Sequence, residues 1–301
     1  MKDLLFLINP RSKSGNAVKM WENARKKYPI LPVDPVDITK IDIKTIIKQK
    51  QPSVVVIAGG DGTINSVCSE VADMQKKPLL TIIPLGLGNA LSYCLGVENL
   101  EKAVSVIENP EKKITIDLMK TNIPNHEKGV FSISAGFSAR IVFQRQAYKY
   151  IGFGSYIIST IQSLFSHPEN EITFTIDHSV TLTAKASSLI LANSPVIGLN
   201  YIVAPNARLN DGFLDGTLIS TKYSDITNMR LRGFKHPLYS ELGKVRFKAK
   251  HISIEGEPFV QIDGDPAKQK GKIEIEILPS QVTFLRNSDN NIDQEYLPFV
   301  K

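Results

Sequence analysis

The residues best suited to chemistry lie in one glycine-rich stretch, Gly59-Gly60-Asp61-Gly62-Thr63-Ile64-Asn65, between an expected strand and an expected helix. Glycines let the backbone approach a ligand closely, and a helix N-terminus offers unpaired N–H groups with roughly half a positive charge. The stretch therefore predicts a phosphate site, with Thr63 as a donor. Asp61 would repel a phosphate directly, so we expect it to handle Mg²⁺ or to bind a hydroxyl. The alternative is a tight turn in which Asp61 or Thr63 caps the helix.

A second glycine loop, Gly86-Leu87-Gly88-Asn89, follows the next expected strand. The carboxyl ends of parallel strands are where α/β sheets bind ligands, so two neighbouring loops strengthen the prediction of a binding site. The chain has neither a P-loop motif with its lysine nor the dinucleotide fingerprint with its distal acidic residue. A dinucleotide-dependent dehydrogenase is therefore not favoured.

Two further acidic segments lie in the second half of the chain. NDGFLD (210–215) contains Asp211 in a glycine turn, which suits Mg²⁺ or is simply a hairpin turn. QIDGDPA (261–267) contains Asp263 and Asp265. Phosphoryl transfer to an alcohol needs an acceptor for the hydroxyl proton, and a carboxylate can serve; the alternative is a solvated turn.

The elements that position these residues change character along the chain. In the first 118 residues, apolar strands at 4–8, 53–60 and 79–84 alternate with helical patterns, which predicts a parallel sheet covered on both faces. From about 119, short alternating runs predict an antiparallel sandwich with one helix-like interruption near 139–165. We therefore expect an α/β domain over 1–118 and a β-sandwich over 119–285. The tail at 286–301 is expected to pack back on the first domain.

Composition excludes several classes. The 301 residues carry a net charge of +6 and a pI near 9.1, which favours anionic partners. The basic residues are scattered, so a nucleic-acid partner is not expected. The apolar run at 4–8 is too short for a signal peptide, no stretch suits a membrane span, and two cysteines fit a reducing compartment. The expected location is cytoplasmic.

Several motifs together resemble one known family. They are Asn9-Pro10 with Ser14-Gly15, GGDGT (59–63), PLGLGNAL (84–91), FSISAGFSARIV (131–142), YIGFGSYIISTIQSLF (150–165), ANS (192–194), PNARLNDGFLDG (205–216) and QIDGDPA (261–267). In this order they resemble the diacylglycerol-kinase-like lipid kinases, which include bacterial diacylglycerol and phosphatidylglycerol kinases and the sphingosine and ceramide kinases. The resemblance implies an NAD-kinase- or phosphofructokinase-like α/β domain that binds ATP, a β-sandwich domain for the lipid, and an active site in the cleft between them.

The resemblance also implies a role for each matching residue. The expected ATP-binding residues are Asn9, Thr39, Gly59, Gly60, Asp61, Gly62, Thr63, Asn65, Gly86, Gly88 and Asn89, although Thr39 lies closer to GGDGT than is usual. A structural Mg²⁺ is expected at the Asp211 carboxylate and the carbonyls of Arg208 and Phe213. Asp265 stands at the place of the catalytic glutamate, with Asp263 supporting it.

Three residues depart from the family pattern. Leu87 removes a hydroxyl from the second loop, Ala90 replaces an aspartate, and Asp265 is one methylene shorter than glutamate. A base misplaced by ~1 Å can cost ~10²-fold in rate. The main hypothesis is therefore an ATP- and Mg²⁺-dependent lipid kinase, and the alternative is a relative that binds nucleotide or lipid with impaired catalysis. A soluble NAD kinase is less favoured.

A lipid substrate also predicts contact with a membrane. Arg140, Arg145 and Lys149 precede the uncharged stretch at 150–168, an arrangement suited to an anionic bilayer surface. The alternative is that this stretch only covers the sandwich. We expect peripheral membrane association, whereas the identity of the lipid and a homodimer are left open.

Overall fold

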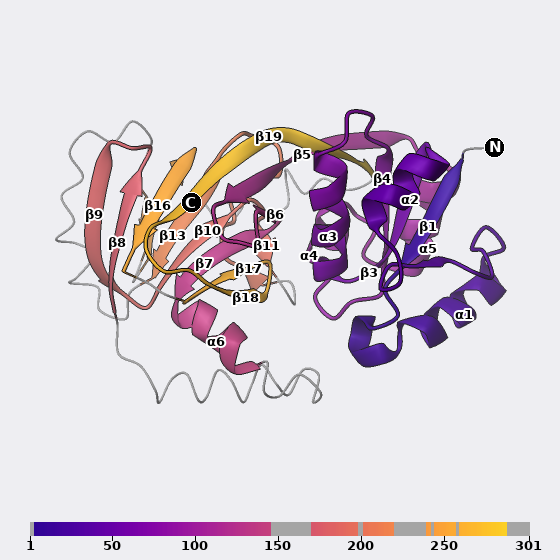
Figure 1. Ribbon diagram of the computed structural model, residues 1–301, viewed down its shortest axis with the longest axis horizontal. Helices are drawn as coiled ribbons and strands as arrows, with labels where there is room; N and C mark the ends of the chain where they lie inside the picture. Colours follow the sequence, from indigo (N-terminus) through magenta and orange to yellow (C-terminus); the bar gives the residue numbers. More distant parts are fainter. Residues whose placement is uncertain are drawn as a thin grey trace. The chain divides into compact units, whose positions relative to one another are not determined.

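The computed structural model describes residues 3–145, 170–197, 201–219, 239–241, 244–256 and 259–287 (Figure 1). The chain divides into two compact units. The first contains the chain up to Ile116, the segment Val196–Tyr201 and the chain from Ser280 onward. The second contains Asp117–Pro195 and Ile202–Pro279.

A parallel sheet forms the centre of the first unit. Its strands are, in spatial order, β2 (Val36–Asp37), β1 (Leu4–Ile8), β3 (Val54–Gly59) and β4 (Leu79–Pro84). The last part of β19 (Ile273–Arg286) adds to the β4 edge, also in parallel, with Phe284 opposite Leu80. Every residue of β3 is buried, as expected for a continuous apolar strand covered on both faces. The expected parallel-sheet α/β architecture is therefore confirmed.

Amphipathic helices cover this sheet. They are α1 (Ala17–Lys27), after the 3-10 turn η1 (Ser12–Gly15), α2 (Ile43–Lys50), α3 (Asp61–Ala72), α4 (Ala90–Cys94) and α5 (Leu100–Glu108). The helix α3 packs on β3 and α5 packs on β4. Asp42 and Asn99 cap α2 and α5, each accepting a hydrogen bond from a first-turn N–H. Apolar residues at helical spacing therefore produce the helices that the sequence predicts.

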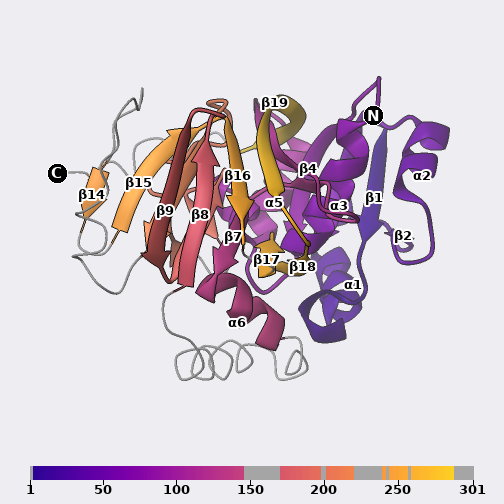
Figure 2. The ribbon, with the colours of Figure 1, turned by 60° about the vertical axis from the view of Figure 1, so that its left-hand side comes forward.

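The second unit is built from two antiparallel sheets. One contains the first part of β19 with β16 (His251–Glu255), β8 (Asn170–Ile176) and β9 (Val180–Ala186), which run side by side in Figure 2. The strands β5 (Lys112–Thr121) and β6 (Lys128–Gly129) belong to the same hydrogen-bonded network. The other sheet contains, in order, β14 (Tyr239–Glu241), β15 (Lys244–Ala249), β13 (Leu214–Ile219), β10 (Ser188–Ala192), β7 (Ser132–Gly136), β17 (Phe259–Ile262) and β18 (Asp265–Lys268). A separate pair, formed by β11 (Val196–Ile197) and β12 (Tyr201–Ile202), belongs to the first unit except for Ile202.

A single apolar core joins these two sheets. Phe174 of β8 stacks on Phe247 of β15, with ring centroids 5.7 Å apart. Buried residues of both sheets, among them Ile172, Leu189 and Ile252, belong to the same cluster. Along β9 buried and exposed residues alternate, as expected for a sheet with one face on the core. The antiparallel sandwich predicted for the second half is confirmed.

The helix α6 (Phe137–Arg145) follows β7 and packs against β7, β17 and β18 (Figure 2). It contains the first part of the helix-like segment that the sequence predicts. The apolar stretch that follows, with Lys149, lies outside the described residues, as does the tail from 288 onward. Asn287, the last residue described, donates its N–H to the Leu95 carbonyl of the first unit. Within the described ranges, no helix is both long enough and apolar enough to cross a membrane.

Candidate nucleotide-binding and phosphoryl-transfer sites

The two glycine loops touch each other at the carboxyl edge of the parallel sheet. A Cβ placed on Gly86 would lie 2.4 Å from the Gly60 Cα, and one on Gly60 would lie 2.9 Å from the Gly86 Cα. Real Cβ atoms do not approach other carbons this closely, so the contact requires glycine on both sides. The loops after β3 and β4 therefore form one continuous backbone surface.

Asn89 closes the second loop from within. Its Oδ1 accepts the Gly86 N–H at 2.9 Å, its Nδ2 donates to the Gly86 carbonyl at 3.1 Å, and its backbone is left-handed, with φ 50°. Asparagine tolerates this conformation better than most residues. The amide that the sequence places in the ATP site thus holds the loop in shape. Leu87, at the tip of this loop, is 40% exposed.

Asp61 binds the beginning of α4. Its Oδ1 accepts the Ala90 N–H at 2.9 Å. Burial raises the pKa of the Asp61 carboxyl to about 6. The backbone N–H groups of Ala90, Leu91 and Asn89 have the opposite, smaller effect, because their hydrogen bonds favour the ionised form. Asp61 therefore joins the first glycine loop to the helix after the second. Its predicted contact with Mg²⁺ or a hydroxyl stays a prediction.

The N-terminus of α3 lies beside Asn9. The Asn9 Nδ2 donates to the Thr63 Oγ1 at 2.9 Å, and the Asn9 Oδ1 accepts the Arg11 N–H at 3.0 Å. Gly60 precedes the helix in an extended conformation, and no side chain caps this end of α3 in the described structure. The first N–H groups of α3 therefore indicate a candidate anion site, because an uncapped helix N-terminus attracts phosphate.

The remaining predicted ATP-binding residues differ in their surroundings. Gly59 has no room for a side chain, because a Cβ there would lie 2.6 Å from the Thr63 side chain, whereas a Cβ on Gly62 would meet nothing within 4 Å. Gly88 lies in the second loop, and the Asn65 Oδ1 accepts a hydrogen bond from the Ser69 hydroxyl. Thr39 follows β2 at the same sheet edge, where its N–H and hydroxyl both donate to the Asp37 carboxylate. The glycine loops and Asn9 thus form one connected cluster.

In the second unit, Asp263 belongs to the two-residue turn that joins β17 to β18. Asp263 and Gly264 both have positive φ, 52° and 86°, the combination of a type I′ hairpin turn. The Asp263 carboxylate accepts the backbone N–H groups of Val130, Phe131 and Ser132 at 2.6, 2.8 and 2.9 Å. Asp263 therefore fastens the turn to the start of β7.

Asp265 is the first residue of β18 and is exposed. It pairs across the hairpin with Ile262, which is buried. The Gln261 side chain accepts the Gly264 N–H at 2.6 Å and donates to the Ser134 hydroxyl at 3.0 Å. The Asp265 carboxylate is therefore accessible from solvent, as a proton acceptor must be. The catalytic role of Asp265 stays a prediction.

The Asp211 loop contains an ion pair that the sequence does not reveal. The Lys248 Nζ lies 2.5 Å from the Asp211 Oδ2 and 3.4 Å from the Asp215 Oδ2. Burial raises the pKa of Asp215 to about 6, although Lys248 favours its ionised form. The predicted Mg²⁺ site, with the carbonyls of Arg208 and Phe213, stays a prediction. In the described ranges, no three His, Cys, Asp or Glu side chains form a cluster that could hold a metal ion, and a site of one carboxylate with backbone carbonyls is not tested by this.

Sequence reasoning missed two side chains that support the Asp211 loop, the buried Asp117 and the partly buried Lys248. The Asp117 Oδ2 accepts the Gly212 N–H at 2.7 Å, and Lys248 reaches Asp211 from 37 positions away. Neither belongs to a motif. Asn193, in the ANS motif, donates to the Asp117 and Val130 carbonyls. The ANS motif is therefore the sequence feature from which this hydrogen-bond network could have been predicted.

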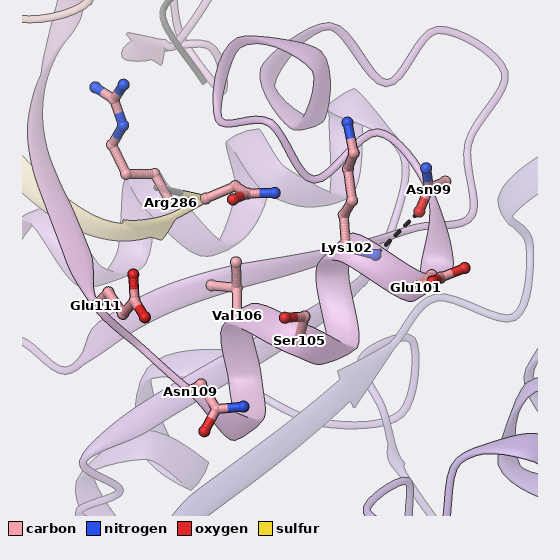
Figure 3. A pocket seen from close by; sticks show the side chains of 9 residues that line it. Asn99, Glu101, Lys102, Ser105, Val106, Asn109, Glu111 and Arg286 are labelled. Carbon is pink, nitrogen blue, oxygen red and sulfur yellow. Dashed lines mark hydrogen bonds between the residues drawn. The ribbon is translucent and has the colours of Figure 1, made fainter. Parts of the chain in front are cut away.

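A hollow of about 590 Å³ lies along α5 (Figure 3). None of its lining residues belongs to either glycine loop. Its lining residues include Asn99, Lys102, Glu111 and Arg286, and the dashed bond in Figure 3 is the cap of α5. None of the predicted site residues lines this hollow. The glycine loops of the first unit and the β17–β18 hairpin of the second unit therefore stay two separate candidate sites.

The structure combines two contacting glycine loops on a parallel sheet with an antiparallel sandwich in a second unit, the arrangement expected of a kinase-like protein with two domains. Known families agree with this class. The sequence model of the "Diacylglycerol kinase catalytic domain" matches residues 3–121, and that of the "YegS C-terminal NAD kinase beta sandwich-like domain" matches residues 131–286. The chain belongs to the diacylglycerol-kinase-like family of lipid kinases.

Individual relatives are distant. A protein of Staphylococcus haemolyticus named "Putative lipid kinase" is 26% identical over 246 residues, which is 79% of this chain and 77% of the relative. A protein of the same name from Staphylococcus aureus is 24% identical over 82% of each chain. Two crystal structures from Bacillus anthracis, titled as diacylglycerol kinases (one as "putative"), cover 95% of this chain. They show TM-scores of 0.70 and 0.64 at 22% and 19% identity, which supports the fold.

Proposed function

We propose that this family member transfers the γ-phosphoryl group of Mg²⁺-bound ATP to the hydroxyl of a diacylglycerol-like lipid at a membrane surface. The observation that supports it most directly is the contact of the two glycine loops beside the uncapped N-terminus of α3. Backbone N–H groups with the helix dipole bind phosphate without a lysine. This fits a chain that lacks the P-loop motif.

The proposed reaction needs few groups from the protein. The lipid hydroxyl oxygen forms a bond to the γ-phosphorus while the bond from that phosphorus to the β,γ-bridging oxygen breaks and ADP leaves. The Asp265 carboxylate accepts the hydroxyl proton. Asp263 keeps the turn beside Asp265 in place through its three backbone hydrogen bonds. Mg²⁺ enters this proposal as part of the nucleotide substrate.

Purified protein, labelled ATP and a panel of lipids test this proposal. The panel contains diacylglycerol, phosphatidylglycerol, undecaprenol and a long-chain base, with NAD as a separate acceptor. We expect a labelled lipid and no labelled NAD. Asp265→Ala should lower turnover by ~10²–10⁴-fold while ATP binding stays nearly unchanged.

Two outcomes would contradict it. Nucleotide binding without transfer to any lipid would identify a catalytically impaired relative. In that case we expect the matched variant Asp265→Glu, alone or with Leu87→Thr, to restore transfer. Labelled NAD would identify a soluble NAD kinase. Flotation with anionic and with zwitterionic vesicles checks the membrane part of the proposal, because peripheral binding to an anionic surface should be lost in the zwitterionic ones and at high salt.

A further inference from the structure

The loop before β13 holds a cluster of one cation and two anions. Lys248 of β15 and Asp215 of β13 are directly opposite each other in the antiparallel register. This pairing directs the lysine side chain toward the loop, where its Nζ lies 2.5 Å from the Asp211 Oδ2. The side chains of Lys248, Asp211 and Asp215 are 31%, 21% and 11% exposed. The ammonium is therefore partly buried against both carboxylates.

The same loop is closed by hydrogen bonds from its own backbone. The Asp211 Oδ1 accepts the Phe213 N–H at 3.1 Å, and the Gly212 N–H donates to the Asp117 Oδ2 at 2.7 Å. Gly212 has a φ of +73°, which suits glycine. Both oxygens of Asp211 thus have partners within the protein, one a backbone N–H and the other an ammonium.

This arrangement does not fit a bound Mg²⁺. The ion demands near-octahedral oxygen ligands at about 2.0–2.1 Å, with carboxylates as its usual protein donors. At Asp211 that position would bring Mg²⁺ close to the Lys248 ammonium, which already lies 2.5 Å from the same carboxylate. The two cations would repel each other strongly in a partly buried site. The Asp211 carboxylate can therefore bind either the Lys248 ammonium or Mg²⁺, and not both at once.

We propose that the Lys248 ammonium takes the place of a divalent cation at the Asp211 loop, so that the second unit holds this loop without metal. The charges support the replacement. Asp211 and Asp215 bring two negative charges and Lys248 one positive charge, so these three side chains sum to −1, and Arg246 also favours the ionised form of Asp215. Removing the lysine leaves two neighbouring carboxylates and a net charge of −2, which is the environment that a hard divalent cation prefers. Lys248→Met therefore converts a metal-independent loop into a metal-responsive one.

Thermal unfolding of the full chain, without nucleotide, tests the proposal. Wild-type protein is compared in EDTA and in millimolar MgCl₂, and the melting temperature should differ by no more than about 1 °C. Lys248→Met should melt roughly 5–15 °C lower in EDTA, because it leaves two partly buried carboxylates without their cation, and should recover part of this loss in MgCl₂. The matched control is Lys250→Met. Lys250 is exposed, and its Nζ lies 5.4 Å from the centroid of the Phe213 ring, which the Lys248 Nζ approaches to 5.6 Å. This variant should respond to metal no more than wild type.

A second measurement does not depend on the stability of any variant. Mn²⁺ is titrated into wild-type protein and followed by electron paramagnetic resonance. We expect no tight site that Asp211→Asn abolishes. Such a site, or a wild-type melting temperature that rises by several degrees in MgCl₂, overturns the proposal. A Lys248→Met protein as stable as wild type in EDTA overturns it too, since the ammonium would then not stabilise the loop.

Discussion

Replacing Asp263 by alanine should destabilise the second unit severely. Its carboxylate accepts three backbone N–H groups, from Val130, Phe131 and Ser132, and all three residues are buried. A hydrogen bond to a charged group contributes about 1.5–3 kcal/mol, and a buried N–H left without a partner costs about 1–3 kcal/mol. Alanine at the positive φ of this turn adds about 1 kcal/mol.

These terms are not additive, because water can reach a half-buried turn and satisfy part of the loss. We therefore expect about 4 kcal/mol rather than the full sum, which corresponds to a fall in melting temperature of roughly 8–16 °C. Asp263→Gly keeps the positive φ without strain and removes only the carboxylate. It should lose about 1 kcal/mol less than Asp263→Ala.

Urea unfolding and thermal unfolding measure both effects, and Asp265→Ala is the matched control. Asp265 lies two positions away on the same hairpin, is exposed, and should change stability by less than about 1 kcal/mol. Its expected loss is in turnover instead. If Asp263→Ala and Asp265→Ala melt within about 2 °C of each other, the fastening role of Asp263 is wrong.

Three further predictions concern the glycine loops and Asn9 beside them. Gly86→Ala should lose about 1–3 kcal/mol of stability, because its Cβ would meet the Gly60 Cα at 2.4 Å. A Cβ on Gly62 meets nothing within 4 Å, so Gly62→Ala should keep its stability and lose only nucleotide affinity, which calorimetry measures. Equal melting temperatures for Gly86→Ala and Gly62→Ala would contradict this. Asp61 is protonated more readily when folded, with a pKa raised from 3.8 to about 6, so its contribution to stability is present below pH 4 and lost as the pH rises to 6. Unfolding at several pH values should show Asp61→Asn gaining up to about 3 kcal/mol relative to wild type across that window, and a constant difference would refute the assignment. Asn9→Asp keeps an acceptor for the Arg11 N–H but adds a negative charge beside α3. ATP affinity should fall about tenfold at unchanged melting temperature, and unchanged affinity would place the phosphates elsewhere.

The sequence predicts most of the architecture because the signals are local. Continuous apolar runs followed by glycines place β3 and β4 next to each other and bring their loops to one edge. What the sequence does not reveal is how the loops are tied together. Asp61 accepts the N–H of Ala90, 29 positions away, and this bond depends on the close approach of the two glycine loops rather than on any spacing.

The same limit separates the two aspartates of the hairpin. The motif QIDGDPA predicts a turn and two acidic side chains, but the direction of each follows from the backbone. At Asp263 the left-handed conformation directs the carboxylate to the N–H groups before β7, whereas Asp265 begins a strand and is exposed. Lys248 belongs to none of the sequence motifs, so its contact with Asp211 could not be predicted from the sequence. It reaches Asp211 only because the strand register places it opposite Asp215.

The contact between Gly60 and Gly86 has a consequence for how the protein can evolve. Each glycine leaves no space for a Cβ on the other, so a side chain at either position is tolerated only if the partner loop moves as well. Substitutions in the two loops should therefore be epistatic: a change at Gly86 that is harmful alone becomes acceptable only after compensating shifts around Gly60. Selection acts on the pair as one unit, although 26 positions separate the two residues. Directed-evolution libraries that vary only one loop should recover glycine at that position almost without exception.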